Sequence, residues 1–207
     1  TTEIYTLSLH DALPISYRGV ALACFSSDLV FDGRTPTPYV ESSDVAPLNV
    51  YGGSKAIAER RVLARHPGAL IIRTSAFFGP WDGHNFLTCA LAALARGDEF
   101  LAIDDVRVSP TYIPDLVHAC LDLLIDGERG IWHLANRGNV TWAEFARAGA
   151  EACRVSADSL RRRTLDLFCL PARRPRFSVL GSERGLLLPS FEDALGRYAQ
   201  ACAVIRS

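Results

Sequence analysis

Val20-Ala-Leu-Ala-Cys-Phe-Ser-Ser27, followed at positions 51–55 by Tyr-Gly-Gly-Ser-Lys, decides the fold of this chain. The first stretch is a short apolar run that ends in hydroxyls, which is typical of a parallel strand buried on both faces. The second opens a helix predicted from Tyr51 to about Ala64, on which Tyr51 and Lys55 share one face. A hydroxyl at the end of a strand, beside a Tyr and a Lys on a helix, can move a proton onto a carbonyl. An enzyme is therefore the leading hypothesis.

The composition bounds the class of protein. The chain has 207 residues, 49% hydrophobic and 22% charged, so it can bury one substantial core and a second small one. Its formal net charge of −1 favours neither nucleic acid nor a membrane surface as a partner. No run approaches the roughly 18 apolar residues of a membrane-spanning helix. The six cysteines are far apart and lack metal-ligand spacing, so we expect buried free thiols, a cytoplasmic location and no metal.

Strands and helices alternate along the rest of the chain. Further strands are predicted at Ala69–Thr74 and Ile131–Ala135. Further helices are predicted at about Asn85–Arg96, Asp115–Ile125, Thr141–Cys153 (opened by the capping-box spacing of Thr141 and Glu144) and Phe191–Ile205, and the arginines of 161–163 are assigned to a surface helix. The alternation predicts an α/β fold with a parallel sheet. Because no strand is followed by G-x-G-x-x-G or a P-loop, the phosphate-binding half of a doubly wound fold is missing from the sequence.

The first residues are unusual. The chain contains no Met, and Thr1–Ser16 has neither the basic nor the apolar region of a signal peptide. The segment Thr6–Ile15 resembles one reading frame of a common sequencing adapter. We therefore expect that residues 1–16 are a non-native leader, that the native N-terminus has been lost, and that His10 and Asp11 have no function.

Three segments carry a resemblance to a known family: Ser26-Ser-Asp-Leu-Val-Phe-Asp-Gly33, Pro47-Leu-Asn-Val-Tyr-Gly-Gly-Ser-Lys55 and Arg73-Thr-Ser-Ala-Phe-Phe-Gly79. Shorter matches follow in order at Asn85-Phe86, Pro110–Tyr112, Asp115-Leu116, Gly130–Ala135, Trp142–Phe145 and Arg174–Leu180. Over about residues 20–200 the chain resembles an extended short-chain dehydrogenase/reductase. Within that superfamily it most resembles the dTDP-4-dehydrorhamnose reductases.

The resemblance implies a reduction by NADPH or NADH in the full-length protein. Tyr51 would be the general acid, which protonates the C4 oxygen of a nucleotide sugar as hydride arrives at the carbon. Lys55 would hold the nicotinamide ribose, and Ser27 would orient the reacting oxygen. A chain that lacks the glycine-rich segment is expected to bind the cofactor poorly and to turn over little by itself.

The resemblance also implies the remaining contacts of the site. The cofactor would contact, besides Tyr51 and Lys55, residues at the ends of strands, namely Ser26, Thr74, Ser75, Ala76 and Phe77. The substrate would contact Asp28, Asn85, Arg107 and Arg174. Asn85 is equally explained as a helix cap, and Arg107 as a surface arginine. Partners are thus a nucleotide sugar and, as one option, a second copy in a homodimer.

Two departures from the family pattern bear on function. Ser27 and Leu29 stand where the family usually has Thr and Tyr: the serine keeps the hydroxyl, but Leu29 removes a polar group near the pocket. Leu29 also weighs against the dehydratases, which place Glu at that position. Two alternatives stay open: a nucleotide-sugar epimerase, and a non-catalytic subunit that resembles the regulatory subunit of methionine adenosyltransferase. Retention of Ser27, Tyr51 and Lys55 favours chemistry.

The expected fold is the C-terminal part of a doubly wound, Rossmann-like parallel sheet with a small, mainly helical substrate-binding region. Residues 17–80 and 108–136 would form the partial NAD(P)-binding domain, and 81–107 and 137–207 the substrate-binding region. Outside the site, the three tryptophans and two of the histidines are interpreted as core residues, namely Trp81, Trp132, Trp142, His118 and His133. Asp32 is interpreted as a turn residue.

Overall fold

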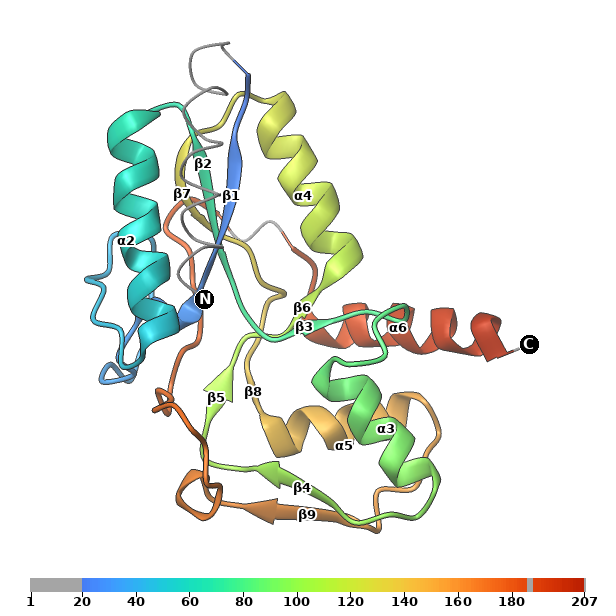
Figure 1. Ribbon diagram of the computed structural model, residues 1–207. Helices are drawn as coiled ribbons and strands as arrows, with labels where there is room; N and C mark the ends of the chain where they lie inside the picture. The colour runs from blue at the N-terminus through green and yellow to red at the C-terminus, as the bar shows by residue number, and fades with distance from the viewer. Residues whose placement is uncertain (1–19, 186–187, 207) are drawn as a thin grey trace.

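The computed structural model describes residues 20–185 and 188–206, with a parallel sheet at its centre (Figure 1). The sheet has the order β1-β2-β7, formed by β1 (Ala23–Ser27), β2 (Leu70–Thr74) and β7 (Gly130–His133). Helix α2 (Val50–Arg65) covers one face and α4 (Ile113–Ile125) the other. The alternation of strands and helices along the sequence is thus confirmed as a parallel α/β layer structure.

Alternate residues of β2 face the two helices. Leu70 and Ile72 belong to the cluster that contains Leu116 and Leu123 of α4, whereas Ile71 packs with Val62 of α2. All five residues of β2 are buried. The continuous apolar run in the sequence is explained by this position between two helices.

The sheet meets α2 at a glycine. The short 3-10 helix η1 (Asp28–Val30) follows β1 directly, and a Cβ built on Gly52 would lie 2.0 Å from the carbonyl oxygen of Leu29. Only glycine allows this approach. The end of β1 and the first turn of α2, which carries Tyr51, are therefore held against each other.

A second region adjoins the carboxyl ends of the strands. Its core contains Phe78, Phe145, Phe191 and Tyr198. Its elements are the helices α3 (Phe86–Ala95), α5 (Trp142–Ala152) and α6 (Phe191–Arg206), the short helix η2 (Leu165–Leu167), and three strand pairs: parallel β3 (Phe77–Phe78) with β6 (Thr111–Tyr112), parallel β4 (Phe100–Ile103) with β9 (Leu160–Arg163), and antiparallel β5 (Arg107–Val108) with β8 (Val140–Thr141). The capping box of Thr141 and Glu144 is confirmed at the start of α5.

Three helices end in the same hydrogen-bond pattern. After α3, the Gly97 amide donates to the Leu94 carbonyl (3.0 Å) and the Asp98 amide to the Ala93 carbonyl (3.0 Å). This pair of hydrogen bonds is the Schellman motif, in which the residue that turns the chain takes a left-handed conformation. Gly97 (φ 77°) and Gly127 after α4 (φ 70°) fill that position with glycine, whereas Arg154 (φ 56°) fills it after α5.

Several predictions are wrong. The arginines of 161–163 form strand β9 beside β4 rather than a helix, because buried Leu160 and the pairing to β4 hold the chain extended. Trp81 is 72% exposed in the turn after Pro80 and is no core anchor. His118 lies on the exposed face of α4. Cys89 and Cys169 are exposed thiols rather than buried ones.

Other predictions hold. His133 and Trp132 are buried. Asp32 accepts a hydrogen bond from the Arg34 amide (3.1 Å), as expected of a turn residue. The predicted leader, with His10 and Asp11, lies outside the described residues.

Candidate active site

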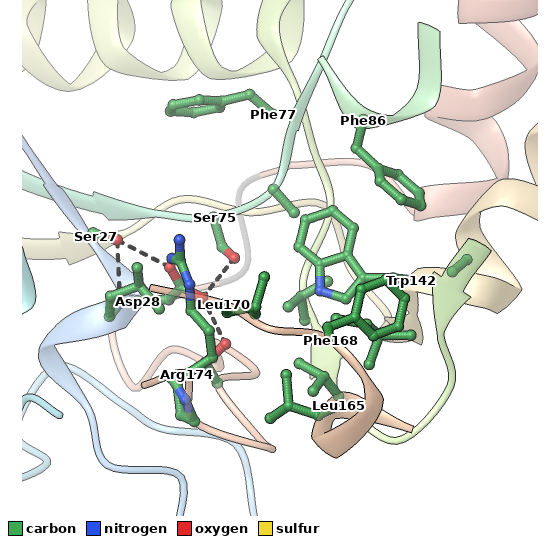
Figure 2. A pocket seen from close by; sticks show the side chains of 18 of the residues that line it. Ser27, Asp28, Ser75, Phe77, Phe86, Trp142, Leu165, Phe168, Leu170 and Arg174 are labelled. Atoms are coloured by element: carbon green, nitrogen blue, oxygen red, sulfur yellow. Dashed lines mark hydrogen bonds between the residues drawn. The ribbon is translucent and has the colours of Figure 1, made fainter. Parts of the chain in front are cut away.

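A cavity of about 590 Å³ lies where the sheet meets the second region (Figure 2). One end is polar and is formed by the residues that follow β1 and β2 together with the segment around Arg174. The other end is apolar and is formed by the second region. The carboxyl ends of the strands, where ligands of open parallel sheets bind, thus open into the cavity.

The Asp28 carboxylate is the centre of the polar end. It is buried and accepts hydrogen bonds from Ser27 (3.0 Å), Ser75 (2.8 Å) and Ser178 (2.6 Å) (Figure 2). Burial raises the pKa of Asp28, and the three serine hydroxyls oppose part of that rise.

Ser27 is the last residue of β1 and lines the cavity. Its hydroxyl oxygen accepts from the Leu29 amide at 3.1 Å, and its proton is donated to Asp28 Oδ1 at 3.0 Å. A serine hydroxyl has one proton and two lone pairs. One lone pair of Ser27 therefore stays available toward the cavity.

Tyr51 and Lys55 lie one turn apart at the start of α2. Tyr51 lines the cavity and is 46% exposed. The Lys55 ammonium lies 5.7 Å from the centroid of the Tyr51 ring and donates to the Phe25 carbonyl at 3.1 Å. The cation is thus held between the Tyr51 ring and the edge of β1, next to the cavity rather than among the residues that line it.

Asn49 fixes the start of α2 and ties it to the opposite wall. Its side-chain oxygen accepts from the Gly52 amide (2.8 Å), which caps the helix. Its side-chain nitrogen donates to the Arg173 carbonyl (2.9 Å), directly before Arg174. One amide side chain therefore joins the Tyr51 helix to the segment that brings Arg174 into the cavity.

A buried ion pair lies beneath the site. Glu59 lies two turns beyond Tyr51 on α2. Its carboxylate accepts two hydrogen bonds, of 2.9 and 2.7 Å, from the guanidinium of Arg73 in β2. Glu59 also accepts from the Ser26 hydroxyl. The pair locks α2 to the strands on which the polar end of the cavity is built.

All but one of the residues predicted to contact the cofactor line the cavity, the exception being Lys55. Ser26, Tyr51 and the segment 74–77 all line the cavity. Ala76 has φ 42°, a left-handed conformation that L-residues adopt at a cost. Lys55 uses one of its three N–H donors within the described part of the chain, so it fits a role as donor to a ribose.

The residues predicted to contact the substrate divide into two groups. Asp28 and Arg174 line the cavity, whereas Asn85 and Arg107 do not. Asn85 is the buried cap of α3: it accepts from the Thr88 amide (2.9 Å) and donates to the Gly79 carbonyl (3.1 Å). The structure thus shows Asn85 as a helix cap, which is one of the two roles that the sequence left open.

The side chain of Arg107 binds within the second region. It donates to Asn139 (2.9 Å) and pairs with Glu144 (3.3 Å). This places its guanidinium at the start of α5 rather than in the cavity.

The apolar end was not predicted from the sequence. Aromatic side chains form much of it, among them Phe86, Trp142 and Phe168 (Figure 2) and also Phe100, whose ring centroid lies 5.6 Å from that of Phe86. The remaining apolar residues there are Leu101, Ala102, Ile103, Val106, Val108, Leu165 and Leu170. Phe86 and Trp142 lie in segments that match the family, but no motif marks β4 or the segment after β9, because these reach the cavity only through tertiary packing.

The described residues form neither a metal-binding cluster nor a membrane-spanning helix. Within the described residues, no group of three or more His, Cys, Asp or Glu side chains is arranged to hold a metal ion. None of the helices in that part of the chain is both long and apolar enough to span a bilayer.

Known proteins are similar to this chain in sequence and in architecture. The family model described as RmlD substrate binding domain matches residues 12–203, which includes the last residues of the predicted leader. A dTDP-4-dehydrorhamnose reductase of Mycolicibacterium smegmatis is 37% identical over 162 residues, covering 77% of this chain and 49% of that protein. A dTDP-4-dehydrorhamnose reductase of Mycobacterium tuberculosis (H37Rv) is 35% identical over 174 residues, covering 82% and 57%.

A solved structure agrees with these relatives. The crystal structure of dTDP-4-dehydrorhamnose reductase from Bacillus anthracis in complex with NADP superposes with a TM-score of 0.87 at 29% identity, covering 96% of this chain and 70% of that one. The chain spans about half the length of the curated relatives, 49% and 57% of the two above. By the extent of the family match and by these likenesses, the chain belongs to the RmlD substrate binding domain family.

Proposed function

We propose that the full-length protein containing this chain reduces the 4-keto group of a dTDP-4-dehydro-deoxysugar with NADPH or NADH, as in the biosynthesis of dTDP-L-rhamnose. One observation carries the proposal: Ser27 and Tyr51, from different elements, line one cavity, and Lys55 lies against the Tyr51 ring. The curated relatives named dTDP-4-dehydrorhamnose reductase support the same reaction.

The cofactor, when bound, supplies a hydride to the carbonyl carbon. Tyr51 donates its phenolic proton to the carbonyl oxygen, which becomes the new hydroxyl. The Lys55 cation stabilises the phenolate that Tyr51 leaves behind. Ser27 orients the carbonyl oxygen within reach of Tyr51. The apolar end of the cavity keeps bulk water from the reacting groups.

Different residues would hold the cofactor and the substrate in this proposal. Lys55, Ser26 and the segment 74–77 would hold the nicotinamide and its ribose. Arg174 binds the diphosphate of the nucleotide sugar, since a guanidinium matches phosphate oxygens. The NADP in the Bacillus anthracis reductase supports NADPH as cofactor, with NADH as the second candidate.

The remaining assignments follow from this chemistry. Substrate and cofactor are both water-soluble, which supports a cytoplasmic location. The partners are small molecules, with neither nucleic acid nor membrane, and a homodimer is the assembly to test. Residues 17–80 and 108–136 are the cofactor side of the protein, and 81–107 and 137–207 the substrate side.

Two alternatives compete with the reductase. A nucleotide-sugar epimerase would return its hydride to the sugar, so it would consume no NADPH. A regulatory subunit would bind without turnover, and would need neither Tyr51 nor Ser27.

The test follows NADPH oxidation by the full-length protein with 4-keto dTDP-sugars. We expect turnover, and we expect Tyr51→Phe to lower kcat by about 10²- to 10⁴-fold because the proton donor is lost. Tyr112→Phe is the matched control, since Tyr112 is buried against α6 outside the cavity. Full turnover by Tyr51→Phe would show that the acid is misassigned, and sugar conversion without NADPH consumption would favour the epimerase.

A further inference from the structure

The Asp28 carboxylate joins three separate segments of the cavity wall. Ser27 ends β1, Ser75 follows β2, and Ser178 lies far along the chain beyond Arg174. Ser75 and Ser178 both bind Oδ2, whereas Ser27 alone binds Oδ1. Within the described residues no ion pair neutralises Asp28, so hydrogen bonds stabilise it, chiefly those from the three hydroxyls.

This arrangement decides where the Ser27 proton points. The Leu29 amide already fills one lone pair of Ser27, at 3.1 Å, and the single proton of the hydroxyl goes to Asp28. A carbonyl oxygen in the cavity can receive that proton only if Ser27 turns it away from Asp28. The carboxylate and the substrate carbonyl therefore compete for one proton.

We propose that Asp28 is a positioning residue that acts on the reduction through Ser27: it accepts the hydrogen bond of the Ser27 hydroxyl until the substrate carbonyl accepts that hydrogen bond instead, while the proton stays on Ser27. The inference rests on the proposed function and changes the expected role of Asp28 from a substrate contact to a control on the orienting hydroxyl. The asymmetry of the two carboxylate oxygens supports it. When Ser27 turns, Oδ2 keeps the Ser75 and Ser178 bonds, so the wall stays in place.

The isosteric variant Asp28→Asn separates the two roles. The amide oxygen takes the Oδ2 position, where two hydroxyls donate, and the amide nitrogen faces Ser27. Ser27 then accepts from both this amide and Leu29, and its proton turns into the cavity. If Asp28 acts through Ser27, the variant helps orient the carbonyl; if Asp28 binds the sugar itself, the variant weakens catalysis.

The experiment is a double-mutant cycle in the full-length protein: wild type, Asp28→Asn, Ser27→Ala and the double variant, with NADPH and the 4-keto dTDP-sugar. We expect Ser27→Ala to lower kcat by about 10²-fold. Asp28→Asn should raise kcat several-fold when Ser27 is present and change it less than about twofold in the Ser27→Ala background. The effect should appear in kcat, because the hydrogen bond strengthens as negative charge develops on the oxygen.

Asp32→Asn is the matched control, because Asp32 lies in a turn outside the cavity and should leave kcat unchanged. The same factor for Asp28→Asn in both backgrounds, including no change in either, would overturn the inference while leaving the proposed reductase in place. A second cycle in the free energy of unfolding uses the same proteins and needs no activity. Coupling between positions 27 and 28 is expected there, and additivity would overturn the hydrogen bond on which the inference depends.

Discussion

Arg154 occupies the one Schellman position described here that lacks glycine, so Arg154→Gly should stabilise the protein. The left-handed conformation costs an L-residue about 1–2 kcal/mol, which glycine avoids. Glycine loses about 0.5–1 kcal/mol more conformational entropy on folding. The expected net gain is about 0.5–1 kcal/mol in the free energy of unfolding. Arg154 is exposed, and no hydrogen bond of its side chain is seen in the described structure, so little else is lost.

Urea unfolding followed by circular dichroism measures the gain. For a chain of this size, 1 kcal/mol corresponds to a shift of about 2–4 °C in Tm. The slope of the free energy against urea should not change, because the surface exposed on unfolding is the same.

The other two helix ends provide the controls. Gly97→Ala and Gly127→Ala should each destabilise by about 1 kcal/mol, because alanine must adopt the same positive φ. A Cβ at either position meets no atom within 4 Å, so sterics add nothing to the backbone effect. If Arg154→Gly lowers the free energy of unfolding while both alanine variants behave as expected, the Arg154 side chain stabilises the protein by more than its backbone conformation costs. That result would refute the reasoning.

Three further changes test the frame of the site. Gly52→Ala places a Cβ 2.0 Å from the Leu29 carbonyl oxygen in η1, so it should push α2 away from the end of β1. We expect Tm to fall by several °C and kcat of the full-length protein to fall with it. Glu59→Gln leaves the buried Arg73 guanidinium without its counter-charge and should cost about 3–5 kcal/mol in urea unfolding. Burial alone would raise the pKa of Asp115. The hydrogen bonds from the paired Arg197 and from the buried Asn136 side chain outweigh burial and hold that pKa below its usual range. Since the folded pKa is the lower one, wild type should exceed Asp115→Asn in unfolding free energy above about pH 4, and the difference should shrink as the pH falls further; a difference that does not change with pH would contradict this.

Local patterns predicted the sheet and its helices because each of these elements carries its own signal. The run at 70–74 identifies a buried strand, and the spacing of Tyr51 and Lys55 identifies the helix before it. The run before Ser27 predicts strand β1 correctly, but its predicted burial on both faces is wrong: β1 is at the edge of the sheet, and Phe25 is 48% exposed. The capping box at Thr141 is equally local. Asn85 could be predicted as a cap for the same reason, although its second reading stayed open.

The apolar end of the cavity depends on contacts between distant segments. β9 consists of one leucine followed by arginines, and nothing in that pattern distinguishes an exposed strand from a helix until β4 lies beside it. Phe100 and Phe168 reach the cavity only because these strands pair and the chain then turns back. The hydrogen bond from Ser178 to Asp28 spans 150 residues and has no sequence signal.

Asn49 gives the site a mechanical property. Its amide holds both the first turn of α2 and the Arg173 carbonyl, so neither can shift without stretching the other's hydrogen bond. A displacement of the backbone next to Arg174 would therefore strain the Asn49 hydrogen bonds and shift the first turn of α2, which carries Tyr51. Under the proposed function, the Asn49 side chain would thus couple the residue that binds the diphosphate of the substrate to the residue that protonates its carbonyl oxygen.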